Sequence, residues 1–450
     1  MRYKETILIG ILFIFLGAYV YFYEILGEPA RRRAAEEKNR IYRFEPDHVS
    51  KITLTRSDSV FEFIRDNDSW SIVRPVSYKA DKNAVDSLIF ALKRTDFIEA
   101  VTEGPDRDEE FGLGTGAIRL TVESDSAAAY TVTAGDLNPA EEYMYARTPE
   151  TEGVSLLTGQ LYKQVNNSLY TFRNKAVFYF DKNNINEITF FHENVHFTVR
   201  KNEQQQWVVT QPLTDDADQS YLDRMLDKIS NGRIQAFIED DIVNLHDYGL
   251  ESPRYRFEMR ESPEDDNVLS LSIGGAAGDN VYIGGNTNDV VYELDSVTVN
   301  MMRPDLFTVR AKKISDFNKN LINNVELNYR DARYVISKQE SSGRWYIMYP
   351  SYLNADEQQV AAIINDIFWI RAAAFVDDMS NNINDYGLDR PQADIILRSS
   401  NKEIERVQLG KSTGDRVYYY SLTKNRLYEI RSYYIDRLVL SREKLVDKEE

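Results

Sequence analysis

The sequence predicts an α+β fold in which an N-terminal transmembrane helix precedes three tandem, mainly antiparallel-sheet modules, each with one principal amphipathic helix. Three observations lead to this prediction. A string of tryptophan, proline, Ala-Asp and Gly-Leu occurs three times along the 450 residues. Within each copy, apolar residues recur first at the spacing of strands and then at the spacing of a helix. An uncharged apolar segment lies close to the first residue.

The uncharged segment runs from Thr6 to Tyr23 and contains 18 residues. As a helix it spans about 27 Å, enough to cross the hydrocarbon core of a bilayer. A cleavable signal peptide is the alternative, but its apolar core is shorter and ends at a small-residue cleavage site. The sequence EILGEP that follows offers no such site. We therefore expect an uncleaved anchor with a short cytoplasmic tail at residues 1–28, and a charged linker at residues 29–45.

The charges around the anchor favour a cytoplasmic position for the modules. Arg2 and Lys4 precede the anchor, whereas Arg31 to Arg33, Lys38 and Arg40 follow it. The positive-inside rule counts basic residues at this distance from a membrane helix. Two acidic residues, Glu36 and Glu37, lie within the cluster and weaken its effect. The residues alone leave the orientation open.

The repeated string divides the rest of the chain into modules at residues 46–182, 183–320 and 321–450. The interval from Trp207 to Trp345 is only one position longer than the interval from Trp70 to Trp207. This period of about 140 residues is too long for a solenoid repeat and has the size of a small domain. Tandem duplication of one structural unit is the simplest explanation.

Each module is expected to begin with a β-hairpin, because short apolar segments alternate around a polar turn, as at residues 52–54 and 61–64. The tryptophan follows in a third strand, which ends at a proline that has no N–H for the sheet. Asp81, Asp218 and Asp356 are predicted N-caps. The apolar stripe of an amphipathic helix follows each cap: Val85, Leu88, Ile89 and Leu92; Leu222, Met225, Leu226 and Ile229; Val360, Ile363, Ile364 and Ile367.

The glycine of each Gly-Leu pair is predicted to adopt the left-handed conformation that closes a turn. Four further strands follow, in the first copy at residues 118–122, 131–133, 143–146 and 154–157, and then a second, shorter helix. The recurring residues form the structural signature of the repeat: Trp70, Asp81, Gly112 and Leu113; Trp207, Asp218, Tyr248, Gly249, Leu250 and Pro253; Trp345, Asp356, Tyr386, Gly387, Leu388 and Pro391.

The composition argues against several functions. The net charge is −18 at pH 7, and an acidic surface repels phosphate, so nucleic acid is not an expected partner. The chain has no cysteine, which excludes disulfides, thiolate metal sites and thiol catalysis. Four histidines, His48, His192, His196 and His246, leave few places for a Ser-His-Asp triad.

One segment, HENVH at residues 192–196, matches the zinc-protease pattern H-E-x-x-H. That chemistry requires a helix, which projects both imidazoles from one face. Here the segment straddles the predicted turn of a hairpin, and the third copy has YRDAR at residues 329–333 in its place. We interpret it as a chance match.

Two loop motifs also suggest ligands. The glycine-rich segment at residues 274–279 runs from strand to strand and is predicted to be a hairpin turn, since a phosphate loop runs from strand to helix. The pairs Asp215-Asp216 and Asp240-Asp241 could be metal ligands or the carboxylates of a glycoside hydrolase. Only the capping Asp218 is shared with the first copy, so solvated loops are the preferred interpretation. His246 has Asn384 as its counterpart, which indicates a turn.

The tyrosines allow two interpretations. Tyr418, Tyr419 and Tyr420 lie on a strand equivalent to that of Tyr282, where they could form a stacking surface for sugars or a protein. Tyrosine also suits the half-buried strands of an antiparallel sheet, which is the preferred interpretation. No residue is therefore predicted to be catalytic, to bind a cofactor or to bind a metal, and we expect that the protein is not an enzyme.

An anchor followed by copies of this string resembles the bacterial family named domain of unknown function 4340. The resemblance rests on Trp70, Trp207 and Trp345, on the Ala-Asp pairs, and above all on YGLESP at residues 248–253 and YGLDRP at residues 386–391. It covers nearly everything after residue 45. The first copy departs from the pattern, with Phe111 in place of the tyrosine and no proline.

Members of this family resemble envelope proteins that accompany ABC-type export systems related to the gliding-motility auxiliary component. The resemblance implies a non-enzymatic accessory or scaffold role at the bacterial cytoplasmic membrane, with the modules on its extracytoplasmic side. The implied partner is an ABC-type permease or its auxiliary subunit, and the family supplies no catalytic residues. The alternative is an envelope protein that binds or processes glycans.

Overall fold

A computed structural model describes residues 39–102, 105–126, 128–193, 195–239, 245–262, 266–285, 290–379 and 382–447, together with residues 3, 16–19, 21 and 264. The chain divides into two compact units. The first unit contains Met1–Val177, Arg233–Ile242 and Val290–Glu293. The second unit contains Phe178–Gly232, Val243–Asp289 and Leu294–Glu450.

Three antiparallel sheets, each with nine strands within the described residues, form the modules. The first module contains β1 (Val49–Thr55), β2 (Val60–Asp66), β3 (Ser69–Arg74), β4 (Tyr78–Lys79), α3 (Lys82–Lys93), β5 (Phe97–Thr102), β6 (Ile118–Ser124), β7 (Ala129–Leu137), β8 (Tyr143–Arg147), β9 (Val154–Thr158), α4 (Gln160–Val165) and α5 (Leu169–Phe172). Short 3₁₀ helices lie at Pro46–His48 and Pro105–Phe111.

The second module repeats this order. It contains β10 (Glu187–His192), β11 (Val195–Lys201), β12 (Trp207–Gln211), β13 (Asp215–Asp216), α6 (Gln219–Ser230), β14 (Ala236–Glu239), β15 (Tyr255–Arg260), β16 (Leu269–Ala277), β17 (Asn280–Gly285), β18 (Val291–Asp295), α7 (Ser296–Met302) and α8 (Leu306–Val309).

The third module repeats it again. It contains β19 (Asn324–Tyr329), β20 (Arg333–Lys338), β21 (Trp345–Tyr349), β22 (Leu353–Asn354), α9 (Glu357–Trp369), β23 (Ala374–Val376), β24 (Ala393–Ser399), β25 (Lys402–Thr413), β26 (Arg416–Ser421), β27 (Arg426–Arg431), α10 (Tyr433–Leu438) and α11 (Arg442–Leu445). Its 3₁₀ helices lie at Lys319–Leu321 and Ile383–Tyr386.

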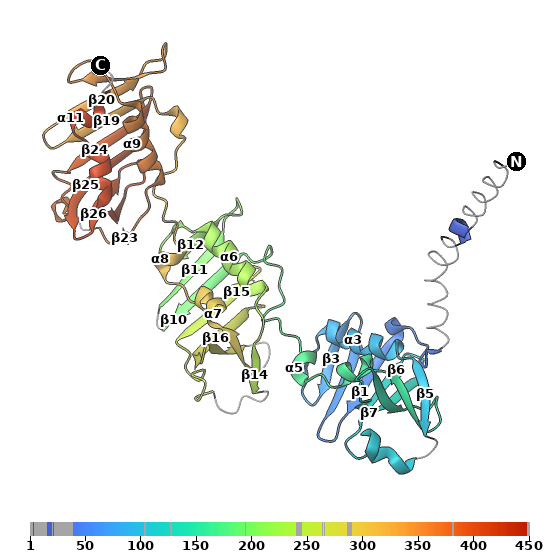
Figure 1. Ribbon diagram of the computed structural model, residues 1–450. Coiled ribbons are helices and arrows are strands. Elements are labelled where there is room, and N and C mark those ends of the chain that lie inside the picture. Colours follow the sequence, from blue (N-terminus) through green and yellow to red (C-terminus); the bar gives the residue numbers. More distant parts are fainter. Residues whose placement is uncertain are drawn as a thin grey trace. The chain divides into compact units, whose positions relative to one another are not determined.

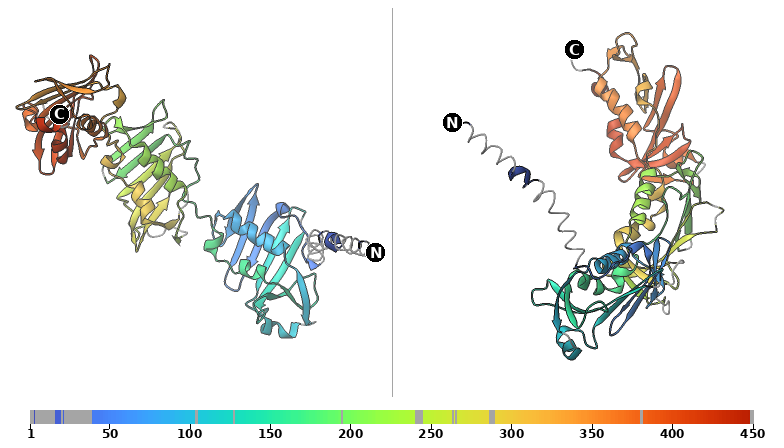
Figure 2. Two further views of the ribbon diagram at one scale, coloured as in Figure 1. Left: turned by 45° about the horizontal axis from the view of Figure 1, so that its top comes forward. Right: turned by 90° about the vertical axis from the view of Figure 1, so that its right-hand side faces the viewer.

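The strand order places distant segments side by side. In the first sheet the order is β4-β3-β2-β1-β6-β7-β8-β9-β5. After the principal helix the chain therefore crosses from the β4 edge to the opposite edge, where it forms β5. The second and third sheets have the same order. Figures 1 and 2 show α3, α6 and α9 crossing one face of their sheets. The apolar stripe of each helix is buried against that face, so each module has a core of its own.

The predicted N-caps are present in all three modules. A carboxylate oxygen of Asp81, Asp218 and Asp356 accepts a hydrogen bond from a backbone amide in the first turn of the following helix, at 3.2, 3.0 and 3.0 Å. The backbone amide of each aspartate donates in turn to a carbonyl of the short helix that ends the module. The last helix is therefore tied to the start of the principal helix.

The Gly-Leu turns have the predicted conformation, with φ of 68° at Gly112, 67° at Gly249 and 70° at Gly387. The amide of the following leucine donates to a carbonyl five residues earlier, as in a Schellman motif. The turn rests on a second glycine, which the sequence analysis did not identify. A Cβ at Gly135, Gly274 or Gly410 would lie only 2.2, 2.2 or 2.1 Å from the carbonyl oxygen of the residue before the turn glycine.

This contact predicts a clear effect for Gly410→Ala. The new methyl group would collide with the backbone at Tyr386, and we expect a loss of about 1–3 kcal/mol in the free energy of unfolding. Gly116→Ala is the control, since nothing lies within 4 Å of its Cβ position. Chemical denaturation of both variants measures the difference. Equal losses would show that the turn does not depend on the close approach.

The structure corrects the sequence prediction in three places. The two-residue strands β4, β13 and β22 and the edge strands β5, β14 and β23 were missing from it. Each module ends in two short helices, not one. Gly274 and Gly275 lie inside β16, where the register shifts, and the turn itself is formed by the residues around Gly278.

The predicted anchor falls almost entirely outside the described residues, which include only residues 16–19 and 21 of Thr6–Tyr23. Among the residues that the structure does describe, no helix has the length and the apolar character needed to cross a membrane.

Candidate functional site

The signature residues build the modules and do not converge on one site. Trp70, Trp207 and Trp345 are buried in the sheet cores, beside the helix that the repeated aspartate of the same module caps. Leu113, Leu250 and Leu388 are buried beneath the turns. Pro253 and Pro391 lie two residues before β15 and β24. These positions place the signature in folding and packing.

The zinc-protease match lies on a hairpin, as predicted. His192 ends β10 and pairs with Val195 at the start of β11, and Glu193 between them has a φ of 52°. The two histidines therefore do not project from one helix face. In the part of the chain that the structure describes, no group of three or more histidine and acidic side chains could hold a metal ion.

Asp215, in the acidic segment after β12, is not solvated, which corrects the sequence interpretation for this residue. The Asp215 side chain is 9% exposed and forms ion pairs with Arg310 and Arg426. Its neighbour Asp216 lies 3.9 Å from Lys424. The Asp216 side chain remains 75% exposed, as expected for a solvated acid. The partners of Asp215 come from distant parts of the chain, which periodicity within one module does not reveal. The pair Asp240-Asp241 lies outside the described residues.

The partners of Asp215 belong to a contact between the second and third modules, here called the second joint, and all its residues lie in the second compact unit. Arg310 follows α8 and is 3% exposed. Its guanidinium donates to Asp215 at 2.7 Å and to both oxygens of Asp377 at 2.7 and 2.8 Å. The same group lies 3.6 Å from the centre of the Phe375 ring, on β23. Because the arginine is buried, bidentate and stacked, it holds the side chains of Asp215, Asp377 and Phe375 in one arrangement.

Further contacts surround Arg310. Phe307, on α8, packs edge-on against Phe375 with ring centres 5.6 Å apart. Arg426, at the start of β27, donates to the Thr214 carbonyl at 2.8 Å and to Asp215. Burial lowers the pKa of Arg426, but the charge and hydrogen bond of Asp215 outweigh it, so the pKa lies above its ordinary value. The arginine therefore stays charged.

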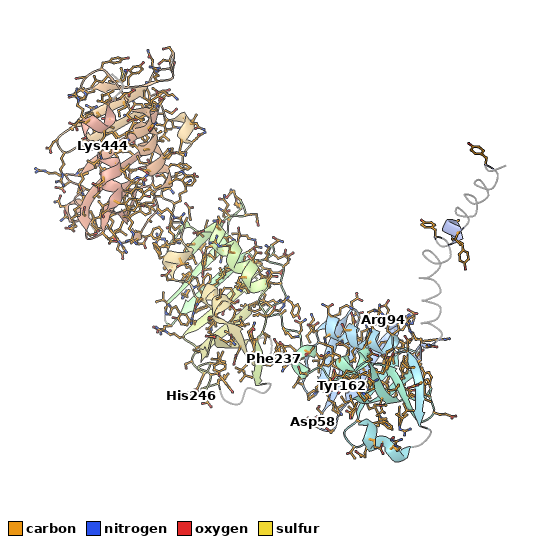
Figure 3. The ribbon with its side chains drawn as sticks, in the orientation of Figure 1. Asp58, Arg94, Tyr162, Phe237, His246 and Lys444 are labelled. Atoms are coloured by element: carbon orange, nitrogen blue, oxygen red, sulfur yellow. The ribbon has the colours of Figure 1, made fainter. Side chains whose placement is uncertain are left out.

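An equivalent contact, the first joint, lies in the first compact unit. Arg173 follows α5, is 2% exposed and lies 3.9 Å from the centre of the Phe237 ring, on β14. The hydroxyl of Tyr170 donates to the Ile234 carbonyl at 2.9 Å. Tyr78 takes the position that Asp215 has in the second joint, and its ring packs edge-on against Phe237 at 5.2 Å. Phe237 is labelled in Figure 3.

The two joints use equivalent positions of the repeat. The interval from Arg173 to Arg310 equals that between the first two repeated tryptophans, and the interval from Phe237 to Phe375 equals that between the last two. Each phenylalanine pairs across the sheet with a tyrosine, Tyr292 or Tyr428, and burial raises the pKa of both tyrosines. One module thus supplies an arginine and the next supplies an aromatic pair at a sheet edge.

The comparison with protein families agrees with the repeat. A family described as "Domain of unknown function (DUF4340)" matches residues 70–215, 207–344 and 345–450. The chain belongs to the DUF4340 family. Each match begins at the repeated tryptophan, on the third strand, whereas each sheet begins two strands earlier. The first two DUF4340 matches therefore extend into the next structural module, and each includes the arginine of a joint, Arg173 or Arg310.

Other comparisons add no function to the DUF4340 assignment. No curated protein matches the chain. Among solved structures, DNA polymerase III subunit beta from Borrelia burgdorferi, in complex with a natural product, has 8% sequence identity to this chain. The comparison covers 89% of this chain and 96% of that one, with a TM-score of 0.14. A score this low does not support a shared fold.

The tyrosines of the third DUF4340 module are largely occupied by packing. Tyr419 is fully buried, and Tyr418 packs edge-on against the signature Tyr386, with ring centres 5.1 Å apart. Tyr282 packs in the same way on Tyr248, at 4.9 Å. The hydroxyl of Tyr420 donates to Asn425. The two edge-on ring contacts stabilise the Tyr-Gly-Leu turns of the second and third modules.

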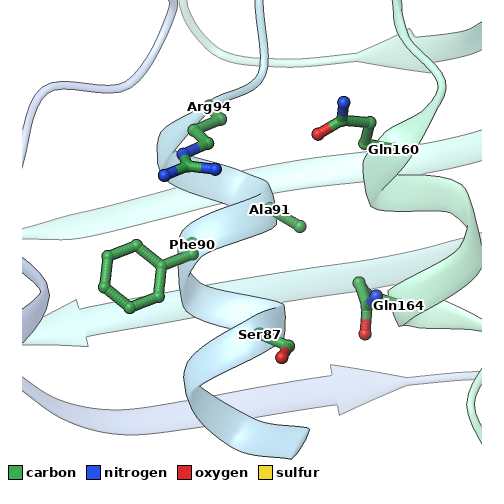
Figure 4. A pocket seen from close by; sticks show the side chains of 6 residues that line it. All are labelled: Ser87, Phe90, Ala91, Arg94, Gln160 and Gln164. Carbon is green, nitrogen blue, oxygen red and sulfur yellow. The ribbon is translucent and has the colours of Figure 1, made fainter. Parts of the chain in front are cut away.

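A surface hollow of about 310 Å³ lies between α3 and α4 of the first module. Figure 4 shows its lining, with Ser87, Phe90, Ala91 and Arg94 on one side and Gln160 and Gln164 on the other. The second module has Asp227 where the first has Phe90, and the third has Asn365. The hollow is therefore not a feature of the DUF4340 repeat.

Proposed function

We propose that this protein is a non-enzymatic, single-pass membrane protein that serves as an accessory or scaffold subunit of an ABC-type envelope transport system. The observation that carries the proposal is that the repeated residues form two sets with different structural roles. Those shared by all three copies build the module, and those shared by neighbouring copies join the modules. Neither set forms a reactive constellation, so the repetition extends a binding surface.

The proposed location is the bacterial cytoplasmic membrane, with the modules on its extracytoplasmic side. Support comes from the 18 uncharged residues at Thr6–Tyr23 and from the envelope proteins that members of the family resemble. The partner that fits a membrane-tethered array is another membrane protein, an ABC-type permease or its auxiliary subunit. The net charge of −18 makes nucleic acid an unsuitable partner.

Co-purification tests the proposed function. The full-length protein, with its N-terminal segment, is isolated from native membranes in mild detergent, and bound proteins are identified by mass spectrometry. We expect stoichiometric recovery of an ABC-type permease or auxiliary subunit. Recovery of the protein alone, or with envelope glycan, would overturn the proposal, and the second result would favour a glycan-binding protein.

A further inference from the structure

The three modules have two joints, and the outer ends of the array depart from the joint pattern. In the first module, Ala100 on β5 pairs with Ser155 on β9. The same positions hold Phe237 and Tyr292 in the second module, and Phe375 and Tyr428 in the third. The first module therefore has two small residues where a preceding module would meet an aromatic pair.

A cavity of about 500 Å³ is present at this end of the first module. Its lining includes Arg40, Phe97, Ala100, Glu150, Thr151 and Glu152. The position corresponds to the sheet edge that carries the aromatic pair in both joints, here called the acceptor face. There, an arginine from the preceding module is buried. The cavity thus occupies the position at which the second and third modules each contact the module before them.

Among the described residues where the chain enters the first module, Arg40 lines the cavity and lies 3.5 Å from Asp96, so its position differs from that of the joint arginines. Arg40 bridges to Asp96 as Ala176 bridges to Arg233 and Lys313 to Arg371, so these entry points are equivalent. Arg173 and Arg310 stand three positions before Ala176 and Lys313. In the sequence, Glu37 holds the corresponding position before Arg40.

The charge of the open end is the reverse of that in the second joint. The turn at residues 423–426 carries Lys424 and Arg426, which contact Asp216 and Asp215 of the preceding module. The equivalent turn of the first module, residues 150–153, carries the exposed acids Glu150 and Glu152. In the second joint, basic side chains of one module meet acidic side chains of the other. By the same complementarity, the acidic turn of the first module fits a basic binding segment.

A second copy of the chain does not fit this end. The donor position of Arg173 and Arg310 is Val446 in the third module, and the position of Tyr170 and Phe307 is Glu443. The C-terminal end therefore lacks both the arginine and the aromatic ring, and it would bring an acid toward Glu150 and Glu152. Neither end therefore offers another copy of the chain the arginine and aromatic residues that form the joints.

We propose that the open end of the first module, formed by the Ala100 cavity and the Glu150–Glu152 turn, docks a basic segment of the membrane partner. The segment presents lysine or arginine side chains, at least one of which enters the cavity as Arg173 and Arg310 enter the joints. This proposal rests on the function proposed above and names the site through which the partner is bound.

Charge reversal at the turn tests this assignment. The full-length protein is compared with a variant carrying Glu150→Lys and Glu152→Lys, by co-purification from native membranes. Partner recovery is expected to fall about tenfold or more, and recovery of wild-type complex is expected to fall with added salt. The control carries Asp331→Lys and Glu340→Lys, which make the same charge change on exposed turns of the third module.

A second variant tests the cavity without changing charge. Ala100→Leu fills part of the cavity with an apolar side chain that offers no aromatic face to a cation, and because Ala100 is exposed the module can accommodate it. We expect this variant also to lose partner, while thermal unfolding of both variants stays close to that of wild type.

The outcomes separate the two proposals. A wild-type protein that recovers no partner overturns the proposed function and the docking site with it. A wild-type protein that recovers partner, together with variants that recover as much, overturns the docking site and leaves the function intact. Equal loss in the Asp331 and Glu340 control would assign the effect to net charge and overturn the site, as would recovery of a second copy in place of the partner.

Discussion

Trp70→Ala is expected to destabilise the first module by about 3–5 kcal/mol, the usual cost of truncating a buried tryptophan. Trp70 is 1% exposed and belongs to the core formed by β1, β2, β3 and α3. Chemical denaturation gives the loss of unfolding free energy, and native-state hydrogen exchange identifies the module that loses protection. We expect that loss in the first module.

Trp369 provides a matched control, because it is the same residue type at 60% exposure. Trp369→Ala is expected to cost less than about 1 kcal/mol, since exposed substitutions usually lie within a few tenths of zero. A further variant, Trp70→Phe, keeps most of the apolar contact and is expected to lose much less than Trp70→Ala. Similar losses for Trp70→Ala and Trp369→Ala would contradict a structural role for the repeated tryptophan.

Arg310→Ala is expected to destabilise the second joint by about 3 kcal/mol, at the lower end of the range for breaking a buried ion pair. The variant leaves Asp377 and Phe375 without the guanidinium, but Arg426 still faces Asp215, which limits the loss. Arg310→Lys keeps the charge without the bidentate geometry and should lie between wild type and Arg310→Ala. Thermal and chemical unfolding, with hydrogen exchange at β13 and β23, measure these differences.

Arg431 is the control for Arg310. It forms an ion pair with Asp415 in which both side chains are more than half exposed, and such pairs contribute at most about 1 kcal/mol. Arg431→Ala should therefore have little effect on stability. If Arg310→Ala costs no more than Arg431→Ala, the joint does not hold the second and third modules together.

Much of each module could be predicted from the sequence because the relevant patterns are local. Strand alternation, the cap at Asp81 and the stripe that begins at Val85 involve neighbouring residues. The two-residue strand β4 is too short to show a period. The edge strand β5 pairs with β9 across a long stretch of intervening chain, and no local pattern specifies such a partner.

The glycines beneath the turns were missed for a related reason. The interval from Gly135 to Gly274 is longer than the interval from Gly274 to Gly410, and neither matches the spacing of the repeated tryptophans. The spacing of these glycines departs from the repeat period because the connecting loops differ in length. The carbonyl that each glycine approaches becomes visible only when the turn and the strand are placed in space.

The joint residues do not recur in all three copies, so a search for residues shared by the three copies does not find them. A residue required in all three copies belongs to the interior of a module, whereas three tandem modules have only two joints. Arg173 and Arg310 have Val446 as their third counterpart, and Phe237 and Phe375 have Ala100. A search for residues shared by two neighbouring copies would have revealed both sides of the joint.

The most direct test of the central claim is the native mass of the full-length protein extracted from its own membranes in mild detergent. We expect a complex that contains one 52.2 kDa chain together with the mass of an ABC-type permease or auxiliary subunit, in fixed proportion. A particle of the single chain alone, or one built only of several copies of it, would contradict the claim.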